Sequence, residues 1–173
     1  KLFCEEQLKG TGAIIVRAAS VVGYAPNQRF DTTINMMTND AYRKGVITVN
    51  GGDQERSHIH IDDLCDFYRM ALTKDVPGET YTPWNISMKI KDTAVTIQEI
   101  FKSRGKSVSI DYKPRTDDRS YKAELSGDSM RSIGAENKKA VWDGVRELIT
   151  KFDAGYWPAS QTDAIYQRIK TSL

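Results

Sequence analysis

No part of this sequence is apolar over a long enough stretch to cross a membrane, since none approaches the ~18 apolar residues that such a helix needs. Charge of one sign is missing too: 25 Lys and Arg nearly cancel 23 Asp and Glu, which argues against a nucleic-acid or membrane-surface binder. Cysteine is scarce, and Cys4 and Cys65 predict free or buried thiols in the reducing cytoplasm rather than a disulfide framework. The 173 residues, 39% of them hydrophobic, suffice for one core of a soluble protein.

The first residue is Lys1 rather than Met, and a helical pattern, LFCEEQL, follows it at once. A signal peptide would instead show basic residues followed by an apolar segment. We therefore expect that this is not a natural translation start and that upstream residues are absent.

Strands and helices are predicted to alternate along the chain. Residues 13–23 are apolar and β-branched almost throughout, which predicts a strand buried on both faces in a parallel sheet. Further strands are predicted at 46–49, at 56–61 and, half-buried, at 107–112. Helices are predicted at 2–9, from a cap at Asp31 to about Gly45, after a cap at Asp62-Asp63, from a capping box at Thr96 and Glu99 to Gly105, at 139–152 and, weakly, at 163–170. This alternation indicates the α/β class.

Five short motifs follow one another in order: KLFCEEQL at 1–8, VRAASVVGYAPNQRFD at 16–31, VNGGDQERSHIHIDDL at 49–64, KPRTDDRS at 113–120 and DGVRELI at 143–149. Together they resemble the second half of extended short-chain dehydrogenases/reductases, the NAD-dependent nucleotide-sugar epimerases and dehydratases. The resemblance implies the C-terminal part of a Rossmann-type α/β fold with its small substrate-binding α/β domain. Residues 1–30 would end the NAD-binding domain, 31–152 would mainly bind the nucleotide sugar, 153–173 would be a C-terminal tail, and the N-terminal Rossmann half is missing.

In this family a tyrosine stands four residues before a lysine that opens a helix, so the resemblance makes Lys1 the active-site lysine. An ammonium near a tyrosine lowers the pKa of the phenol from ~10, which makes the tyrosine a usable base at neutral pH. The same lysine would hydrogen-bond the nicotinamide ribose of NAD or NADP, a cofactor that the missing half would mostly bind. The alternative for Lys1 is an ordinary surface lysine.

Three further positions carry the next expectations from the resemblance. Ala19 would meet the nicotinamide end of the cofactor through its backbone. Ser20 stands where the family commonly has an asparagine that contacts the sugar diphosphate, and a hydroxyl lacks the reach and the two donors of an amide. Asn35 matches an asparagine that reaches the nucleotide diphosphate in relatives; most asparagines inside helices are merely solvated.

Two arginines and one strand complete the expected substrate site. Arg56 and Arg115 match arginines that bind the substrate diphosphate in the family, a task that suits the planar, bidentate guanidinium. Surface ion pairs, for instance with Glu55 or Asp117, are the alternative. Backbone groups around Val49 would help to recognise the nucleotide base. After Arg115 the family usually has a variable residue, glycine and an acidic residue, whereas Thr116, Asp117 and Asp118 stand here.

His58 and His60 are alternate strand residues that could share a zinc ion. The sequence has no other histidine and no convincing cluster of further ligands, so we predict no metal. Asp63 is expected to cap a helix rather than to act as an acid catalyst.

A glycine-rich turn that could hold a dinucleotide pyrophosphate is absent from these residues. We therefore expect an enzyme of transient hydride transfer on nucleotide sugars when intact, a homodimer to which the first helix contributes, and no turnover from this chain alone. Epimerase, dehydratase and decarboxylase are not distinguished. A non-catalytic nucleotide-sugar-binding protein and an inactive gene fragment remain as alternatives.

Overall fold

The computed structural model describes residues 2–115, 130–131 and 133–157. Along the chain these residues form α1 (Leu2–Leu8), β1 (Ile15–Val16), β2 (Ser20–Val22), α2 (Thr33–Lys44), β3 (Val46–Asn50), β4 (Glu55–His60), α3 (Ile61–Thr73), β5 (Thr80–Tyr81), β6 (Ile86–Lys89), α4 (Ile90–Ser103), β7 (Ser109–Lys113) and α6 (Val141–Asp153). The predicted α/β class is confirmed. None of the described helices is long and apolar enough to span a membrane.

The strands form three small sheets. β1 pairs with β5 and β3 pairs with β7, both in parallel. The middle sheet has the order β2-β4-β6, with β2 parallel and β6 antiparallel to β4. Its register aligns Ser20 of β2 with His58 of β4, and His58 in turn with Ile86 of β6.

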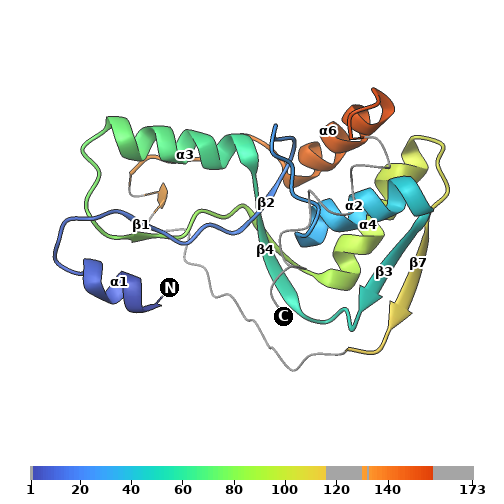
Figure 1. Ribbon diagram of the computed structural model, residues 1–173, viewed down its shortest axis with the longest axis horizontal. Coiled ribbons are helices and arrows are strands. Elements are labelled where there is room, and N and C mark those ends of the chain that lie inside the picture. Colours follow the sequence, from blue (N-terminus) through green and yellow to red (C-terminus); the bar gives the residue numbers. More distant parts are fainter. Residues whose placement is uncertain (1, 116–129, 132, 158–173) are drawn as a thin grey trace.

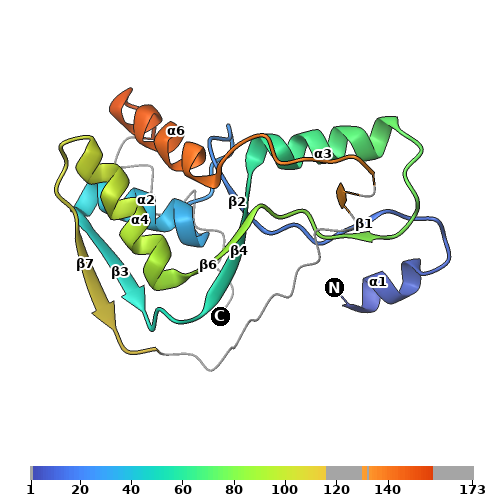
Figure 2. The same ribbon diagram turned by 180° about the vertical axis from the view of Figure 1, so that it is seen from behind.

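The elements gather at two ends of an elongated molecule (Figures 1 and 2). α1, β1 and α3 lie at one end, α2, α4, β3 and β7 at the other, and β2 and β4 run between them. The main core fills the second end, where α2 packs against α4, α6 and β3. Its fully buried members include Ile34, Ile47, Val49, Ala94, Ile97, Phe101, Val145 and Ile149.

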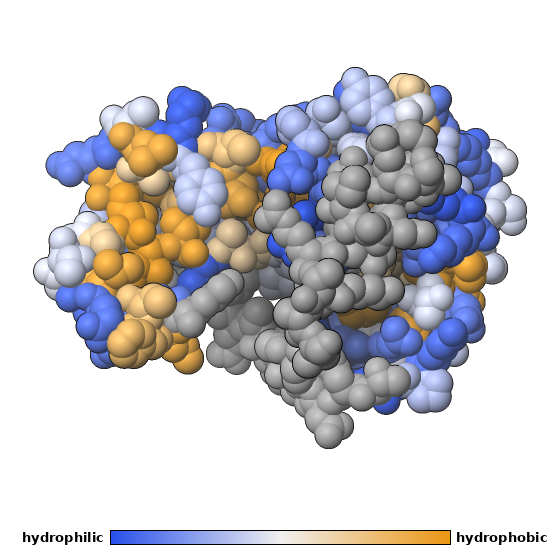
Figure 3. Space-filling view, viewed as in Figure 1, coloured by the Kyte–Doolittle hydropathy of each residue, from blue (hydrophilic) through white to orange (hydrophobic). Residues whose placement is uncertain are grey.

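The first end is much more apolar on its surface. Orange side chains cover a large part of it in Figure 3. On α1 and α3, Leu2, Phe3 and Leu72 expose 77%, 75% and 86% of their surface, and α1 has no buried residue at all. Exposed patches of large apolar side chains are typical of interaction surfaces.

Several predicted elements are confirmed. α6 buries its predicted face, consisting of Val141, Val145, Leu148, Ile149 and Phe152. Gly45 ends α2 in the left-handed conformation, with φ 67°, as glycine beyond a last helical turn commonly does. Cys4 and Cys65 are free thiols, and both are exposed.

The strand predicted at 13–23 is broken. β1 and β2 are separate because the first pairs with β5 and the second with β4, so the chain changes partner between Arg17 and Ala19. Both pairings are parallel as expected, but only Val22 and Gly23 of the segment are fully buried. β7 is likewise exposed along most of its length rather than half-buried.

Three predicted caps are wrong, because each side chain has a different role. Asp31 forms an ion pair with Arg29, and Thr32 precedes α2 without a side-chain cap. α3 is capped by His60, whose Nδ1 accepts the backbone N–H of Asp62 at 3.1 Å. α4 begins at Ile90, not at Thr96, which lies inside the helix with its hydroxyl donating to Asp92 O.

Candidate functional site

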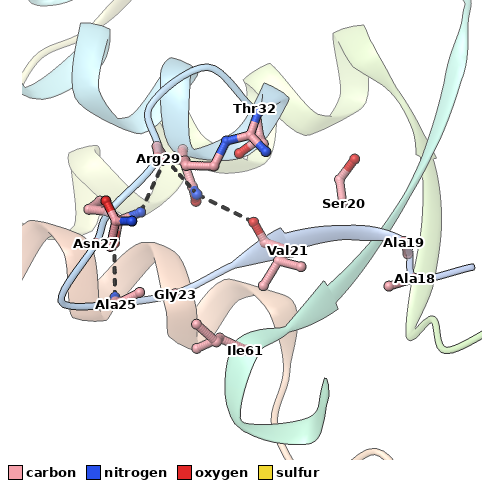
Figure 4. Close-up of a pocket in the computed structure, with 12 residues that line it drawn as sticks. Ala18, Ala19, Ser20, Val21, Gly23, Ala25, Asn27, Arg29, Thr32 and Ile61 are labelled. Carbon is pink, nitrogen blue, oxygen red and sulfur yellow. Dashed lines mark hydrogen bonds between the residues drawn. The ribbon is translucent and has the colours of Figure 1, made fainter. Parts of the chain in front are cut away.

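A cavity of about 370 Å³ opens beside β2 (Figure 4). The strand supplies one wall and the loop that follows it supplies the opposite one, while the first turn of α2 and the start of α3 close the ends. Its lining residues are Ala18, Ala19, Ser20, Val21, Gly23, Ala25, Asn27, Gln28, Arg29, Thr32, Asn35 and Ile61. The loop after a parallel strand is the usual place for a ligand in α/β proteins.

Gln28 shapes the loop from within. Only 2% of its surface is exposed, and its amide oxygen accepts the backbone N–H of Ala25 at 3.0 Å. Its amide nitrogen donates to the carbonyl of Arg29 at 3.2 Å. A buried amide that bridges two backbone groups of its own loop fixes the fold of that loop.

Asn35 ties the loop to the strand. Its amide nitrogen donates to Val21 O at 3.3 Å and to Arg29 O at 3.0 Å. Both neighbours are carbonyl oxygens, so the amide orientation follows from the hydrogen bonds. The amide oxygen is buried, has no partner among the described residues and belongs to a side chain that lines the cavity. The unused hydrogen-bonding group of Asn35 is therefore an acceptor, not a donor.

Arg29 is the cationic side chain of the cavity wall. It forms a bidentate ion pair with Asp31, with Nε–Oδ1 and Nη2–Oδ2 distances of 2.8 Å each. The hydrogen bonds to Asp31 raise the pKa of the guanidinium, although burial acts in the opposite direction. An anionic ligand at this wall would compete with Asp31.

Ala19 and Ser20, two of the predicted site residues, line the same cavity as Asn35. The backbone N–H of Ala19 donates to Pro83 O at 3.0 Å, so this donor is already used within the protein. The Ser20 hydroxyl projects from β2 on the side of Thr32 (Figure 4).

Arg56 does not line this cavity. It stands on β4, two residues before the register partner of Ser20, and alternate strand residues share a face. One of its guanidinium nitrogens donates to Glu55 O at 2.8 Å. The side chain therefore begins on the neighbouring strand, on the same face as Ser20.

Val49 and Arg115 lie at a different place, the shared end of β3 and β7. The Val49 side chain is fully buried in the core, so it offers a ligand only backbone groups, and these pair with Tyr112 of β7. Arg115 is exposed, and its Cβ stands 3.0 Å from the position of a Cβ on Gly51. The structure thus separates these two residues from the cavity. Lys1, Thr116, Asp117 and Asp118 lie outside the described residues.

His58 is a buried imidazole on the middle strand. Its side chain has no exposed surface, and neither ring nitrogen has a hydrogen-bond partner among the described residues. Burial, with a smaller contribution from the positive charge of Arg56, lowers the pKa of His58 to about 4. The ring is therefore neutral at physiological pH.

In the described part of the chain, His60, Asp62 and Glu147 form the one group of three metal-type side chains within reach of one another. His60 Nδ1 accepts a backbone proton, so in the neutral ring Nε2 carries the hydrogen. Nε2 lies 3.4 Å from Glu147 Oε2, but the two atoms do not meet the geometry of a hydrogen bond. A ring nitrogen that carries a hydrogen does not coordinate a metal in that state. The Lys139 ammonium already bridges the carboxylates at 3.3 and 3.4 Å. These contacts join the start of α3 to α6.

Asp63, predicted as a cap, accepts two backbone protons from a distant segment. Its two oxygens lie 3.0 Å from Lys138 N and 3.2 Å from Lys139 N. The carboxylate is 3% exposed. Asp63 therefore holds the segment that precedes α6 against the start of α3.

Asn27, Gln28, Arg29 and Thr32 were not predicted as site residues. The sequence did carry a signal for them, because polar residues cluster in the turn segment directly after an apolar strand. The cavity itself depends on how that turn folds back, which no local pattern specifies.

Residues 3–87 match the model of the NAD dependent epimerase/dehydratase family. The match confirms the resemblance to this family that the sequence motifs predicted. A search of curated proteins returned no match.

Solved structures share the fold at low sequence identity. UDP-glucose 4-epimerase from Thermotoga maritima, solved with UDP-glucose, is 18% identical with a TM-score of 0.71 over 89% of this chain and 50% of that chain. UDP-glucuronic acid 4-epimerase from Bacillus cereus, solved with UDP-glucuronic acid and NAD, is 20% identical with a TM-score of 0.70 over 90% and 50%. The dTDP-glucose 4,6-dehydratase DesIV from Streptomyces venezuelae is 18% identical with a TM-score of 0.71 over 92% and 50%. The chain spans about half the length of these proteins.

Proposed function

We propose that this chain forms the nucleotide-sugar-binding part of an NAD-dependent epimerase or dehydratase. The observation that carries the proposal is the cavity beside β2, which gathers Ala19, Ser20 and Asn35 around one space. In the intact protein the reaction would be a transient hydride transfer at a sugar carbon. Two similar structures contain UDP-sugars, which makes a nucleoside diphosphate sugar the first ligand to test.

The polar groups around the cavity suggest how such a ligand would lie. Arg56, on the strand beside Ser20, would pair with the diphosphate, because a guanidinium matches phosphate oxygens bidentately. The free amide oxygen of Asn35 would accept a hydrogen bond from a sugar or ribose hydroxyl, since phosphate oxygens offer it no donor. The Ser20 hydroxyl can serve either partner.

Arg115 and Val49 have a separate part in the proposal. They lie at the end of β3 and β7, and Arg115 would meet a ligand there only if the nucleotide extends past β4 toward Gly51. The base would then contact backbone groups close to Val49. We keep both assignments as proposals that a bound nucleotide would test.

NAD is the proposed cofactor of the whole protein, where it would accept and return the hydride. Residues 2–115, 130–131 and 133–157 include no glycine-rich turn at a helix N-terminus, so they offer no such site for the pyrophosphate. The contribution of this chain would be the Ala19 carbonyl at the cavity wall and, as the resemblance implies, Lys1. The division into residues 1–30, 31–152 and 153–173 belongs to the same proposal, as do a cytoplasmic location and a homodimer.

The exposed apolar end of the molecule supports this division. Leu2, Phe3 and Leu72 lie at the end where α1 and β1 stand, away from the main core. We propose that the Rossmann half and the partner subunit of the intact protein cover this surface.

A non-catalytic nucleotide-sugar-binding protein is the second candidate. It is favoured by Ser20, which replaces the amide that the family commonly has, and by Asn35, whose two donors already bind backbone carbonyls. Turnover by the intact protein, with a bound nicotinamide cycling between its oxidised and reduced forms, would exclude it.

Calorimetric titration of the folded chain with UDP, dTDP, GDP and CDP tests the proposal. We expect one nucleotide to bind in the micromolar to millimolar range and Arg56→Ala to weaken it about tenfold or more. Arg69→Ala is the matched control, since Arg69 is an exposed arginine on α3 that pairs with Asp66. No binding, or equal losses in both variants, would contradict the proposed site.

A further inference from the structure

The loop that forms one wall of the cavity has an aromatic residue at each end, and both meet the same indole. The ring centroid of Tyr24 lies 5.8 Å from that of Trp157, and that of Phe30 lies 5.2 Å from it in an edge-to-face arrangement. Aromatic pairs at these distances attract beyond their buried area. Residues separated by more than a hundred positions are thus joined at the ends of one loop.

Other aromatic and cationic groups surround this contact. Phe152 of α6 stacks on Phe30 at 5.6 Å and lies 5.3 Å from Trp157. The Lys151 ammonium lies 4.3 Å from the centre of the Tyr24 ring, where a cation–π attraction operates. These contacts hold the loop ends through residues that do not line the cavity.

Trp157 is itself held in an unusual conformation. Its φ is 52°, and it is the one non-glycine residue with positive φ in the described part of the chain. Such a backbone costs about 1–3 kcal/mol for a bulky residue, so surrounding contacts must outweigh it. They include burial of the indole to 7% exposure and a hydrogen bond from Arg43 to the Trp157 carbonyl.

Trp157 does not line the cavity, so any effect on a ligand has to pass through the loop. We propose that Trp157 is a positioning residue that sets the loop from Tyr24 to Phe30 and thereby the shape of the nucleotide-sugar site. The effect on ligand binding rests on the proposed function, whereas the effect on the position of the loop does not. The segment just after α6 is therefore part of the site's architecture, although it makes no contact with the cavity.

The experiment compares Trp157→Ala and Trp157→Phe with Phe67→Leu in the full chain. Phe67 is 1% exposed and contacts Tyr68 and Tyr81 on the other side of the molecule, so its variant controls for lost core packing. Two quantities are measured for each protein: hydrogen exchange of the backbone amides of Tyr24, Ala25 and Gln28, and UDP affinity by calorimetry. Trp157→Phe keeps a ring and covers the case in which the alanine variant does not fold.

We expect Trp157→Ala to speed exchange of the loop amides about tenfold relative to amides of α4, and to weaken UDP binding about tenfold. Trp157→Phe should restore part of both, and Phe67→Leu should leave the ratio of loop to α4 exchange unchanged. Unchanged loop exchange in both Trp157 variants, or an equal change in Phe67→Leu, would overturn the inference. If the parent chain binds none of UDP, dTDP, GDP and CDP, the proposed function fails, whereas the exchange data still decide the position of the loop.

Discussion

Gly144 of α6 lies against Gly23, the residue at which β2 passes into the cavity loop. A Cβ on Gly144 would stand 2.9 Å from the Gly23 nitrogen and 2.9 Å from a methyl of Val22. Real Cβ atoms do not approach backbone so closely, so only glycine lets the helix reach the strand here. The helix that buries the main core therefore also sets where the loop begins.

Gly144→Ala should destabilise the protein by about 1–3 kcal/mol through overpacking. The direction of the change is informative, because helix propensity alone would make the alanine variant more stable by about 1 kcal/mol. Urea unfolding measures the effect. Thr150→Ala, an exposed position two turns further along α6, is the control and should change stability by less than about 0.5 kcal/mol. A stabilised Gly144→Ala protein would show that α6 does not pack as described.

Asp63 and the adjacent Asp62 give a second matched pair. In Asp63→Asn, one of the two accepting oxygens becomes an amide group that is itself a donor and faces a backbone N–H donor. We therefore expect the free energy of unfolding to fall by about 2–4 kcal/mol. Asp62 has a side chain that is 59% exposed. Asp62→Asn should therefore cost less than about 1 kcal/mol. Equal losses from the two substitutions would contradict the role of Asp63 in holding Lys138 and Lys139.

His58 predicts how stability depends on pH. Its pKa is about 4 in the folded protein and near its ordinary 6.5 when unfolded, so the unfolded state binds the proton more readily. This contribution to the free energy of unfolding is fully present above pH 6.5 and is lost as the pH decreases toward 4, by roughly 3 kcal/mol in total. His58→Leu should remove this part of the pH dependence and retain stability at pH 7, since neither ring nitrogen has a hydrogen-bond partner in the part of the chain that the structure describes.

Denaturant unfolding of parent and His58→Leu between pH 4 and 8 measures this difference. Carboxylates titrate in both proteins, so the comparison isolates the histidine. Parallel stability curves for the two proteins would contradict a buried neutral ring at this position.

The sequence specified the regular elements better than their ends. The apolar face of α6 and the glycine after α2 could be predicted because periodicity and left-handed glycine are local signals. Asp31 and Asp63 were wrongly predicted as caps because a carboxylate takes the strongest donors within reach. Those donors, Arg29 and the backbone of Lys138, are known only once the chain has folded.

The candidate site shows the same limit. Motif order placed Ala19, Ser20 and Asn35 in one region, and the cavity brings them together. Arg115 and Val49 could not be placed relative to them, because β3 and β7 pair with each other rather than with the middle sheet. The contact of Trp157 with Tyr24 joins residues with no shared motif, so no pattern in the sequence predicted it.

The most direct test of the central claim is to follow the backbone amide signals of the chain by NMR during titration with UDP. The account predicts saturable shifts concentrated on residues 18–29 and Asn35, and their loss in Ser20→Phe, whose ring would fill the cavity. Shifts centred instead on the surface between α4 and β7, or no shifts at all in a folded chain, would contradict the assignment of the cavity as the nucleotide-sugar site.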